Sequence, residues 1–293
     1  MTDPRIELFE SHRGRLRAVA YRMLGSFSEA DDAVQEAWLR LGRADTSGVA
    51  NLAGWLTTVV ARVCLDMLRS RQSRREEPLG VRLPDPVVSR DDAPDPEQEV
   101  VLADAVGLAL LVVLDTLTPA ERLAFVLHDM FGVPFDEIAP LVGRSRAAAT
   151  QLASRARRRV RGAAVAPDSD RGRQREVVNA FLAAARDGDF ERLLAVLDPE
   201  VVLRVDADAT RHGAPGQWRG ARSVARRAAA YSRLAPFARP ALVNGAAGLV
   251  VTPAGGAPIA VLGFTVRHGK IAEIHIYADA DRLRRLNLAG EPA

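Results

Sequence analysis

The residues of this chain with the clearest capacity for chemistry are arginines. Between Arg144 and Arg161 the chain has seven arginines and no acidic residue. Closely spaced guanidinium groups attract phosphates and release their counterions, so such a run favours a nucleic-acid backbone as the partner. Ser145 can cap a helix that continues to Arg161. The pattern therefore predicts a long helix that presents cations to DNA.

The residues before this helix supply the other half of a helix-turn-helix. Residues 118–121 (Thr-Pro-Ala-Glu) have the pattern of a capping box with proline at the first helical position. A short helix over residues 135–142 follows, and Gly143 provides the turn. A long helix behind a short helix and a tight turn is the arrangement that enters the major groove of DNA. We therefore predict a helix-turn-helix over residues 117–161.

The long helix has two predicted faces. The apolar face packs inward and holds Ala149, Leu152, Ala153, Ala156 and Val160. The opposite face is predicted to bind DNA through Arg146, Thr150, Gln151, Ser154, Arg155 and Arg158. Gln151 and Arg155 suit base edges, whereas the two hydroxyl residues suit either bases or phosphates. The alternative is a solvated helix end whose arginines favour the helix dipole.

A second set of polar residues lies near the N-terminus. Asp32, Gln35 and Glu36 stand at positions i, i+3 and i+4, so a helix places them on one face. Ser28 is the predicted cap of that helix, which continues through Arg40. Such a face is either the solvated side of an amphipathic helix or a surface for a partner protein.

The next predicted helix is apolar at its start and basic at its end. It begins near Trp55 and continues past Asp66. Its last turns carry Arg69, Arg71, Arg74 and Arg75. Arginines at a helix end bind phosphate, and they also interact favourably with the helix dipole.

Composition limits the classes of protein to consider. A length of 293 residues suggests two or three domains, and 48% apolar residues suffice for their cores. Since there is no apolar run of membrane-spanning length and no signal-peptide pattern, we expect a cytoplasmic protein without a membrane partner. The single cysteine, Cys64, cannot form an internal disulfide, and we expect it to bind no metal.

The chain divides into blocks of different character. Helical patterns fill residues 1–76, a linker rich in proline and acidic residues covers 77–97, and the helix-turn-helix domain covers 98–162. A third domain, over residues 171–288, combines helices with strands. Its expected elements are helices over 176–186, 189–197 and 221–234, strands over 200–205, 241–244, 249–251, 259–266 and 271–277, and a hairpin turn at His268-Gly269.

Together, the two helical blocks resemble bacterial RNA polymerase sigma factors of the extracytoplasmic-function group. Residues 30–39 (Ala-Asp-Asp-Ala-Val-Gln-Glu-Ala-Trp-Leu) look like the helix with which that group grips the β′ clamp of the polymerase. Residues 55–75 resemble its reader of the −10 promoter element, and residues 117–161 its reader of the −35 element. The resemblance implies that Asp32, Gln35 and Glu36 bind core polymerase, with the β′ clamp and the β flap as contacts, and that promoter DNA is the other partner. It identifies no anti-sigma factor.

The third domain narrows the resemblance to the sigma factor J-like subgroup, which carries a C-terminal SnoaL-like domain. Residues 82–86 (Arg-Leu-Pro-Asp-Pro) resemble the Trp-Leu-Pro-Glu-Pro motif of that subgroup's linker, with Arg82 in place of the tryptophan. The subgroup's Asp-Gly-Gly-Gly and Asn-Pro-Asp-Lys-Leu motifs are replaced here by residues 206–209 (Asp-Ala-Asp-Ala) and 279–283 (Asp-Ala-Asp-Arg-Leu). The implied fold is multidomain: two all-α sigma domains, the second with the helix-turn-helix, and a C-terminal α+β SnoaL-like domain of the NTF2 fold.

Two other functions fit parts of the chain. A one-component helix-turn-helix transcription regulator with a ligand-sensing C-terminal domain explains residues 98–293 but leaves the first helices without a role. An isomerase-like or cyclase-like enzyme would use candidates from the third domain, namely Asp206, His212, Trp218, Tyr231, His275 and Tyr277. Glu273, His275 and Tyr277 alternate along one strand, whose polar face we expect to be half-exposed. We predict a sigma factor with a regulatory C-terminal domain, no catalytic residue and no cofactor.

Overall fold

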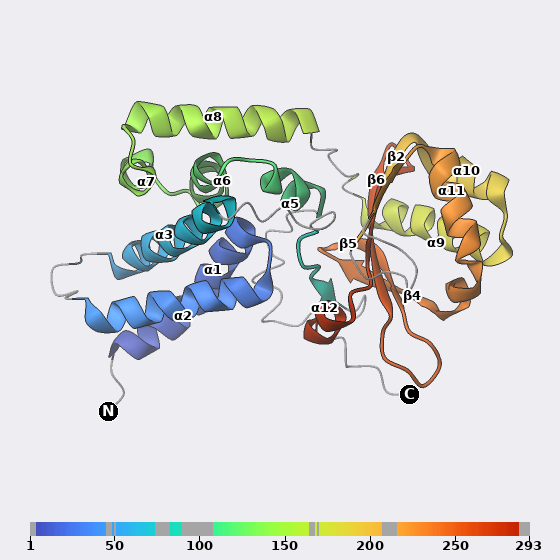
Figure 1. The fold of residues 1–293 in the computed structure, drawn as a ribbon, viewed down its shortest axis with the longest axis horizontal. Helices are drawn as coiled ribbons and strands as arrows, with labels where there is room; N and C mark the ends of the chain where they lie inside the picture. The colour runs from blue at the N-terminus through green and yellow to red at the C-terminus, as the bar shows by residue number, and fades with distance from the viewer. Residues whose placement is uncertain are drawn as a thin grey trace. The chain divides into compact units, whose positions relative to one another are not determined.

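The computed structural model describes residues 4–44, 49, 51–73, 83–89, 108–163, 168, 170–206 and 216–286. These residues form two compact units, and Figure 1 colours the chain from blue at its N-terminus to red at its C-terminus. The first unit holds the described helices up to residue 163, apart from residues 108–109. The second unit holds those two residues, residues 83–89 and the described residues from 168 onward. No described helix is both long and apolar enough to cross a membrane.

The first helical region consists of α1 (Pro4–Leu24), α2 (Phe27–Arg43) and α3 (Leu52–Ser73). The three helices pack around fully buried apolar side chains, among them Leu16, Met23, Leu41, Leu56 and Leu65. In α2 the buried residues recur at spacings of three and four, which is the period of a helix with one apolar face. The opposite face of α2 is therefore left for polar residues.

The start of α2 differs from the prediction. The N-cap is Ser26, which has an extended backbone, and the predicted cap Ser28 lies inside the first turn. Gly25 has a φ of 72° and ends α1 in the left-handed conformation that favours glycine. Because that residue closes α1, Ser26 is the first extended residue and α2 begins directly after it.

The second helical region contains the predicted helix-turn-helix. Its elements are α5 (Leu108–Asp115), α6 (Pro119–Phe125), the π-helical turn η1 (Val126–Met130), α7 (Phe135–Val142) and α8 (Arg146–Ala163). The predicted capping box is confirmed, since Thr118 Oγ1 accepts from the Glu121 amide at 3.4 Å and Glu121 Oε2 accepts from the Thr118 amide at 3.2 Å. Gly143 ends α7 with a φ of 65°, and Ser145 Oγ accepts from the Ala148 amide at 3.3 Å.

The two helical regions pack against each other within the first unit. Arg122, of α6, is only 2% exposed. Its Nε donates to the carbonyl of Arg22, in α1, at 3.2 Å, and its guanidinium also donates to Asp115 Oδ1 at 2.7 Å. Arg15, also in α1, donates to the carbonyl of Phe131 at 3.2 Å. Polar contacts between distant parts of the sequence therefore join the regions.

The second unit is built on one curved sheet. Among the described residues its strand order is β1-β4-β5-β6-β7-β2-β3. The strands are β1 (Val88–Ser89), β2 (Leu197–Val205), β3 (Gly216–Arg219), β4 (Ala238–Val243), β5 (Ala246–Val251), β6 (Ala260–Arg267) and β7 (Lys270–Tyr277). The pair β2–β7 is parallel and the other pairs are antiparallel.

Three helices cover one face of this sheet, as Figure 1 shows. They are α9 (Arg171–Asp187), α10 (Phe190–Val196) and α11 (Ala221–Ala230). Their apolar residues form one core with the strands, and the rings of Phe181 and Phe264 meet edge to face at 5.4 Å. A six-residue helix, α12 (Ala280–Arg285), follows the last strand. An all-α part followed by an α+β part is the predicted fold class.

The predicted elements of the second unit are present with different ends. The helix expected to reach Leu234 stops at Ala230, and the 3₁₀ segment η2 (Ser232–Phe237) follows. Pro236 lies inside this 3₁₀ segment. The hairpin at His268-Gly269 is confirmed, with φ values of 51° and 70°. Strands β1 and β3 were not predicted.

Candidate nucleic-acid and polymerase interfaces

Helix α8 presents the predicted DNA-binding face to solvent. Its inward residues Ala149, Ala153 and Ala156 are fully buried. The predicted contact residues Arg146, Thr150, Gln151, Ser154, Arg155 and Arg158 are all exposed. The two faces derived from the helical period are therefore confirmed, while the DNA contacts themselves stay a prediction.

Ion pairs divide the arginines of α8 into two groups. Arg157 pairs with Asp129 at 2.6 Å, and Arg159 pairs with Glu121, a carboxylate 5% exposed, at 2.8 Å. Arg155 and Arg158 have no carboxylate within 4.0 Å among the described residues. The paired arginines hold α8 on its own domain, whereas the unpaired ones are available to phosphates.

The arginines at the end of α3 have different surroundings. Arg69 is exposed and lies 3.9 Å from Asp66. Arg71 has a side chain only 13% exposed and pairs with Glu29, of α2. The other two predicted contacts, Arg74 and Arg75, lie outside the described residues. Arg71 therefore has a structural partner within the first helical region.

The polar face of α2 lies as the sequence predicts. Asp32 and Gln35 are exposed, and Glu36 is half-buried and accepts from Arg40 Nε at 2.9 Å. The face also includes Leu39, which is 45% exposed. We did not single out Leu39 from the sequence, although its position three residues after Glu36 is a usable signal. An exposed leucine beside carboxylates suits a protein partner.

The single cysteine has no accessible chemistry. Cys64 is fully buried within α3. Burial is the main cause that raises the pKa of its thiol to about 12, and nearby arginines oppose that shift only in part. The thiolate is the reactive form of cysteine, so this side chain has a packing role.

Residues 83–89, within the expected linker, belong to the second unit. Leu83 and Val87 are almost fully buried, and β1 pairs with β4 in the register Val88–Val243. Asn244 fixes the segment twice: its Oδ1 accepts from the Val87 amide at 2.9 Å, and its amide donates to the Val87 carbonyl at 2.7 Å. The proline-rich composition did not indicate this strand.

Arg282, in α12, joins the same segment to the end of β2. Its Nε donates to Asp85 at 2.7 Å, and its Nη1 donates to Asp206 at 3.3 Å. The guanidinium also donates to the carbonyl of Leu83. Burial raises the pKa of Asp206, while the amide of Ala278 and the guanidinium oppose the rise. Asp206, an enzyme candidate, therefore takes part in a structural ion network.

His275 is also part of a buried cluster. Its Nε2 lies 3.2 Å from Arg204 Nη1, and that guanidinium pairs with Glu273 at 3.3 Å. Burial and Arg204 lower the pKa of His275 to about 3, so its ring is neutral. The expected half-exposed polar face was wrong: His275 and Tyr277 are fully buried, and the guanidinium of Arg282 lies over the Tyr277 ring.

The remaining enzyme candidates are not brought together. Trp218 lies under the guanidinium of Arg227, whose Cζ is 3.5 Å from the ring centroid. Tyr231 ends α11 and is 42% exposed. His212 lies outside the described residues. Within the described part of the chain, no group of three or more metal-binding side chains was found.

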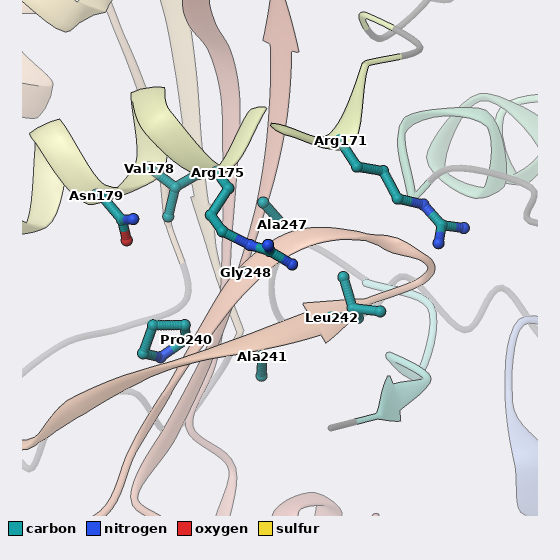
Figure 2. Close-up of a pocket in the computed structure, with 9 residues that line it drawn as sticks. All are labelled: Arg171, Arg175, Val178, Asn179, Pro240, Ala241, Leu242, Ala247 and Gly248. Atoms are coloured by element: carbon teal, nitrogen blue, oxygen red, sulfur yellow. The ribbon is translucent and has the colours of Figure 1, made fainter. Parts of the chain in front are cut away.

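A small pocket lies between α9 and the strands β4 and β5. Arg171, Arg175 and Asn179 contribute from the helix, and Ala247 and Gly248 from the sheet. Figure 2 shows Arg175 extended over the strand and Arg171 pointing away from it. The cavity volume of about 10 Å³ is room for about one water.

Comparison with known proteins identifies the helical regions. The chain matches sigma-70 region 2 over residues 8–74 and sigma-70, region 4 over residues 107–160. It is 46% identical over 220 residues to the ECF RNA polymerase sigma factor SigJ of Mycobacterium tuberculosis, a match that covers 74% of this chain and 70% of the relative. It is 35% identical over 291 residues to the probable ECF RNA polymerase sigma factor SigI of the same species, covering 96% and 95%. The crystal structure of SigJ matches with 37% identity and a TM-score of 0.77, covering 95% of this chain and 98% of that one.

The chain has two sigma-70 regions, and the long helix of the helix-turn-helix in the second one is exposed and rich in arginine. These features define a transcription-initiation protein. Similarity to the sigma factors SigI and SigJ extends over nearly the whole chain and identifies the group of sigma factors. The chain belongs to the extracytoplasmic-function (ECF) RNA polymerase sigma factors, and its third domain has the SnoaL-like α+β fold of the NTF2 type. Core RNA polymerase and promoter DNA are the partners of that family.

Proposed function

We propose that this sigma factor directs core polymerase to its promoters through three separate surfaces. The polar face of α2 binds the β′ clamp, the basic end of α3 contacts the −10 element, and α8 enters the major groove at the −35 element. The observation that carries the proposal is that one chain has two exposed charged faces. The face on α2 is acidic and includes an exposed leucine, and the face on α8 is basic.

The division of labour on α8 follows from its ion pairs. Arg155 and Arg158 are available to DNA because no described carboxylate pairs with them. Gln151 lies on the same exposed face and has the amide geometry that recognises adenine. We also propose that the helix-turn-helix domain binds the β flap of the polymerase. This contact would set the distance between the helix-turn-helix domain and the first helical region.

We assign a regulatory role to the third domain, through the segment of residues 83–89. In the holoenzyme the linker would pass through a basic channel of the polymerase. Here Asp85 is 8% exposed and is held by Arg282, so the segment is sequestered. Release of these residues from the third domain would then accompany assembly on the polymerase.

The buried polar groups of the third domain would serve structure rather than catalysis. Asp206 is engaged by Arg282, and His275 is neutral beside Arg204. Neither residue lines the pocket of Figure 2. Since polymerase is a cytoplasmic enzyme, we place the protein in the cytoplasm.

In vitro transcription tests the central proposal. The protein is mixed with core polymerase and genomic DNA, and the 5′ ends of the transcripts are mapped. We expect starts that share upstream elements and that depend on the added protein. Starts identical to those of core polymerase alone would refute the assignment.

A matched pair of variants tests the regulatory role. Asp85→Asn removes the ion pair with Arg282 and should raise transcription from the mapped promoters. Asp281→Asn removes an exposed pair with Arg284 in the same helix and should not change it. Equal transcription from both variants would leave the third domain without this regulatory contact.

A further inference from the structure

The charge of the third domain is unevenly distributed along the chain. Between Asp208 and Glu273 there is no acidic residue, while eight arginines lie in the same stretch, seven of them before Pro240. The stretch includes the described elements β3, α11, η2, β4, β5 and β6. A long segment with charge of one sign concentrates electrostatic potential on the surface that it forms.

Helix α11 carries this charge outward. Val224 and Ala225 are buried against the domain core, so the opposite side of the helix faces solvent. Arg222 and Arg226 are exposed on it, one turn apart, which is a rise of roughly 6 Å. Figure 1 shows α11 with α10, on the helical side of the sheet.

Two further arginines flank the helix. Arg219 ends β3, just before α11, and Arg233 lies in η2, just after it; both are exposed. We call Arg222, Arg226 and Arg233 the α11 face. No described carboxylate lies within 4.0 Å of any of these three guanidinium groups.

Other arginines of the same domain are neutralised. Arg192 pairs with Asp187 at 3.4 Å and with Asp189 at 3.3 Å. Arg282 pairs with Asp85 and Asp206. Carboxylates therefore neutralise some arginines of the domain, whereas Arg222 and Arg226 of α11 have no such partner among the described residues.

Aromatic side chains accompany these cations. Arg227 stacks on Trp218, and its buried Nε has no hydrogen-bond partner in the described structure. Tyr231, between Arg227 and Arg233 in sequence, is 42% exposed. Phosphate contacts in protein–DNA complexes come from arginine and tyrosine side chains among others.

We propose that the α11 face binds the phosphate backbone of duplex DNA without reading its sequence. Charge complementarity selects this occupant, since the planar guanidinium fork binds phosphate oxygens in pairs. The contact adds to the DNA contacts proposed for α8, and it makes the third domain a second DNA-binding part of the chain.

Salt-dependent binding of the full chain tests this proposal. The probe is a fluorescent duplex without a promoter, and affinity is measured by anisotropy over a range of salt. The Arg222→Gln/Arg226→Gln variant should lower the slope of log affinity against log salt by about 1.8, because two phosphate contacts are lost. At 0.1 M salt the loss of affinity should be on the order of tenfold or more.

Matched variants separate the possible outcomes. Arg192→Gln removes an exposed but paired arginine of the same domain and should leave the slope unchanged. Arg233→Gln should lower the slope by about 0.9, as the loss of one phosphate contact does, without altering α11 itself. Thermal unfolding midpoints equal to that of the parent chain establish that the variants are folded.

Three results would overturn the proposal. One is a slope for the α11 variant equal to that of the Arg192→Gln control. Another is a slope for Arg233→Gln equal to that of the parent chain. The third is unchanged DNA binding with weakened binding of core polymerase, which would make the α11 face a contact for an acidic protein surface. Arg155→Gln/Arg158→Gln is measured in parallel, so that a failure of the α8 assignment is distinguishable from a failure of this one.

Discussion

His275 illustrates how burial decides the chemistry of a single residue. Between pH 6.5 and about 3 the unfolded chain binds a proton at this histidine that the folded chain excludes, because the folded-state pKa is lowered to about 3. The stability of the fold therefore falls as the pH drops below 6.5, by about 2 kcal/mol at pH 5. Urea unfolding at pH 7.5 and pH 5 should show a loss about 2 kcal/mol larger for the parent chain than for His275→Gln.

This comparison does not depend on the absolute stability of the variant. The replacement changes the packing beside Arg204 at both pH values, and only the difference between the two pH values is compared. An equal loss in both chains would mean that His275 titrates normally in the folded state.

Also at the scale of the residue, substitutions at two positions of α8 are expected to change DNA binding in different ways. Arg158→Ala should weaken binding to every duplex and lower the salt slope by about 0.9, as one phosphate contact does. Gln151→Ala should instead relax preference at one base pair, by roughly 1–3 kcal/mol. Arg157→Ala is the control, since that arginine is engaged by Asp129. Affinities that respond equally to the first two changes would contradict the assigned face.

At the scale of an element, the exposed face of α2 is predicted to bind the polymerase. Asp32→Lys/Glu36→Lys should abolish most co-purification with core polymerase, since it reverses charge on the contact face while the buried side of α2 is untouched. Glu10→Lys/Asp31→Lys makes the same change in charge at exposed carboxylates paired with Arg13 and Arg17. If both variants bind core polymerase alike, the clamp contact lies elsewhere.

At the scale of the whole molecule, the contact between the two sigma regions is the feature with a measurable energy. Arg122 is 2% exposed and donates to the carbonyl of Arg22 and to the carboxylate of Asp115. Arg122→Ala therefore removes a buried, charge-assisted hydrogen bond. We expect a loss of about 1–3 kcal/mol in the stability of the first unit. Fluorescent labels on α2 and α8 should also report a larger average separation.

The label experiment has a control with the same loss of charge. Arg159→Ala removes the pair with Glu121 within the second helical region, and Arg159 has no hydrogen bond or ion pair with α1 in the described structure. Its label separation should equal that of the parent chain. An Arg122→Ala variant with unchanged separation would show that apolar packing alone joins the regions.

The sequence alone predicted the features that depend on neighbours a few residues apart. The capping box at Thr118, the turn at Gly143 and the cap at Ser145 are all confirmed, because each is closed by a hydrogen bond or backbone conformation within three residues. The inward alanines of α8 follow from the helical period in the same way. The family resemblance, confirmed by the sigma-70 regions and their relatives, rested on such local patterns in their order along the chain.

Only the tertiary structure determines which arginines of α8 pair with a carboxylate. The sequence shows Arg155, Arg157, Arg158 and Arg159 as one run, and carboxylates 28 and 38 residues away divide it into paired and unpaired members. Part of the expected linker forms strand β1, and Asn244, which accepts a hydrogen bond from the Val87 amide, lies 157 residues later in the chain. His275 is buried beside Arg204, which lies 71 residues earlier in the chain. Each outcome depends on groups that meet only after the chain has closed long loops, and no short pattern contains that information.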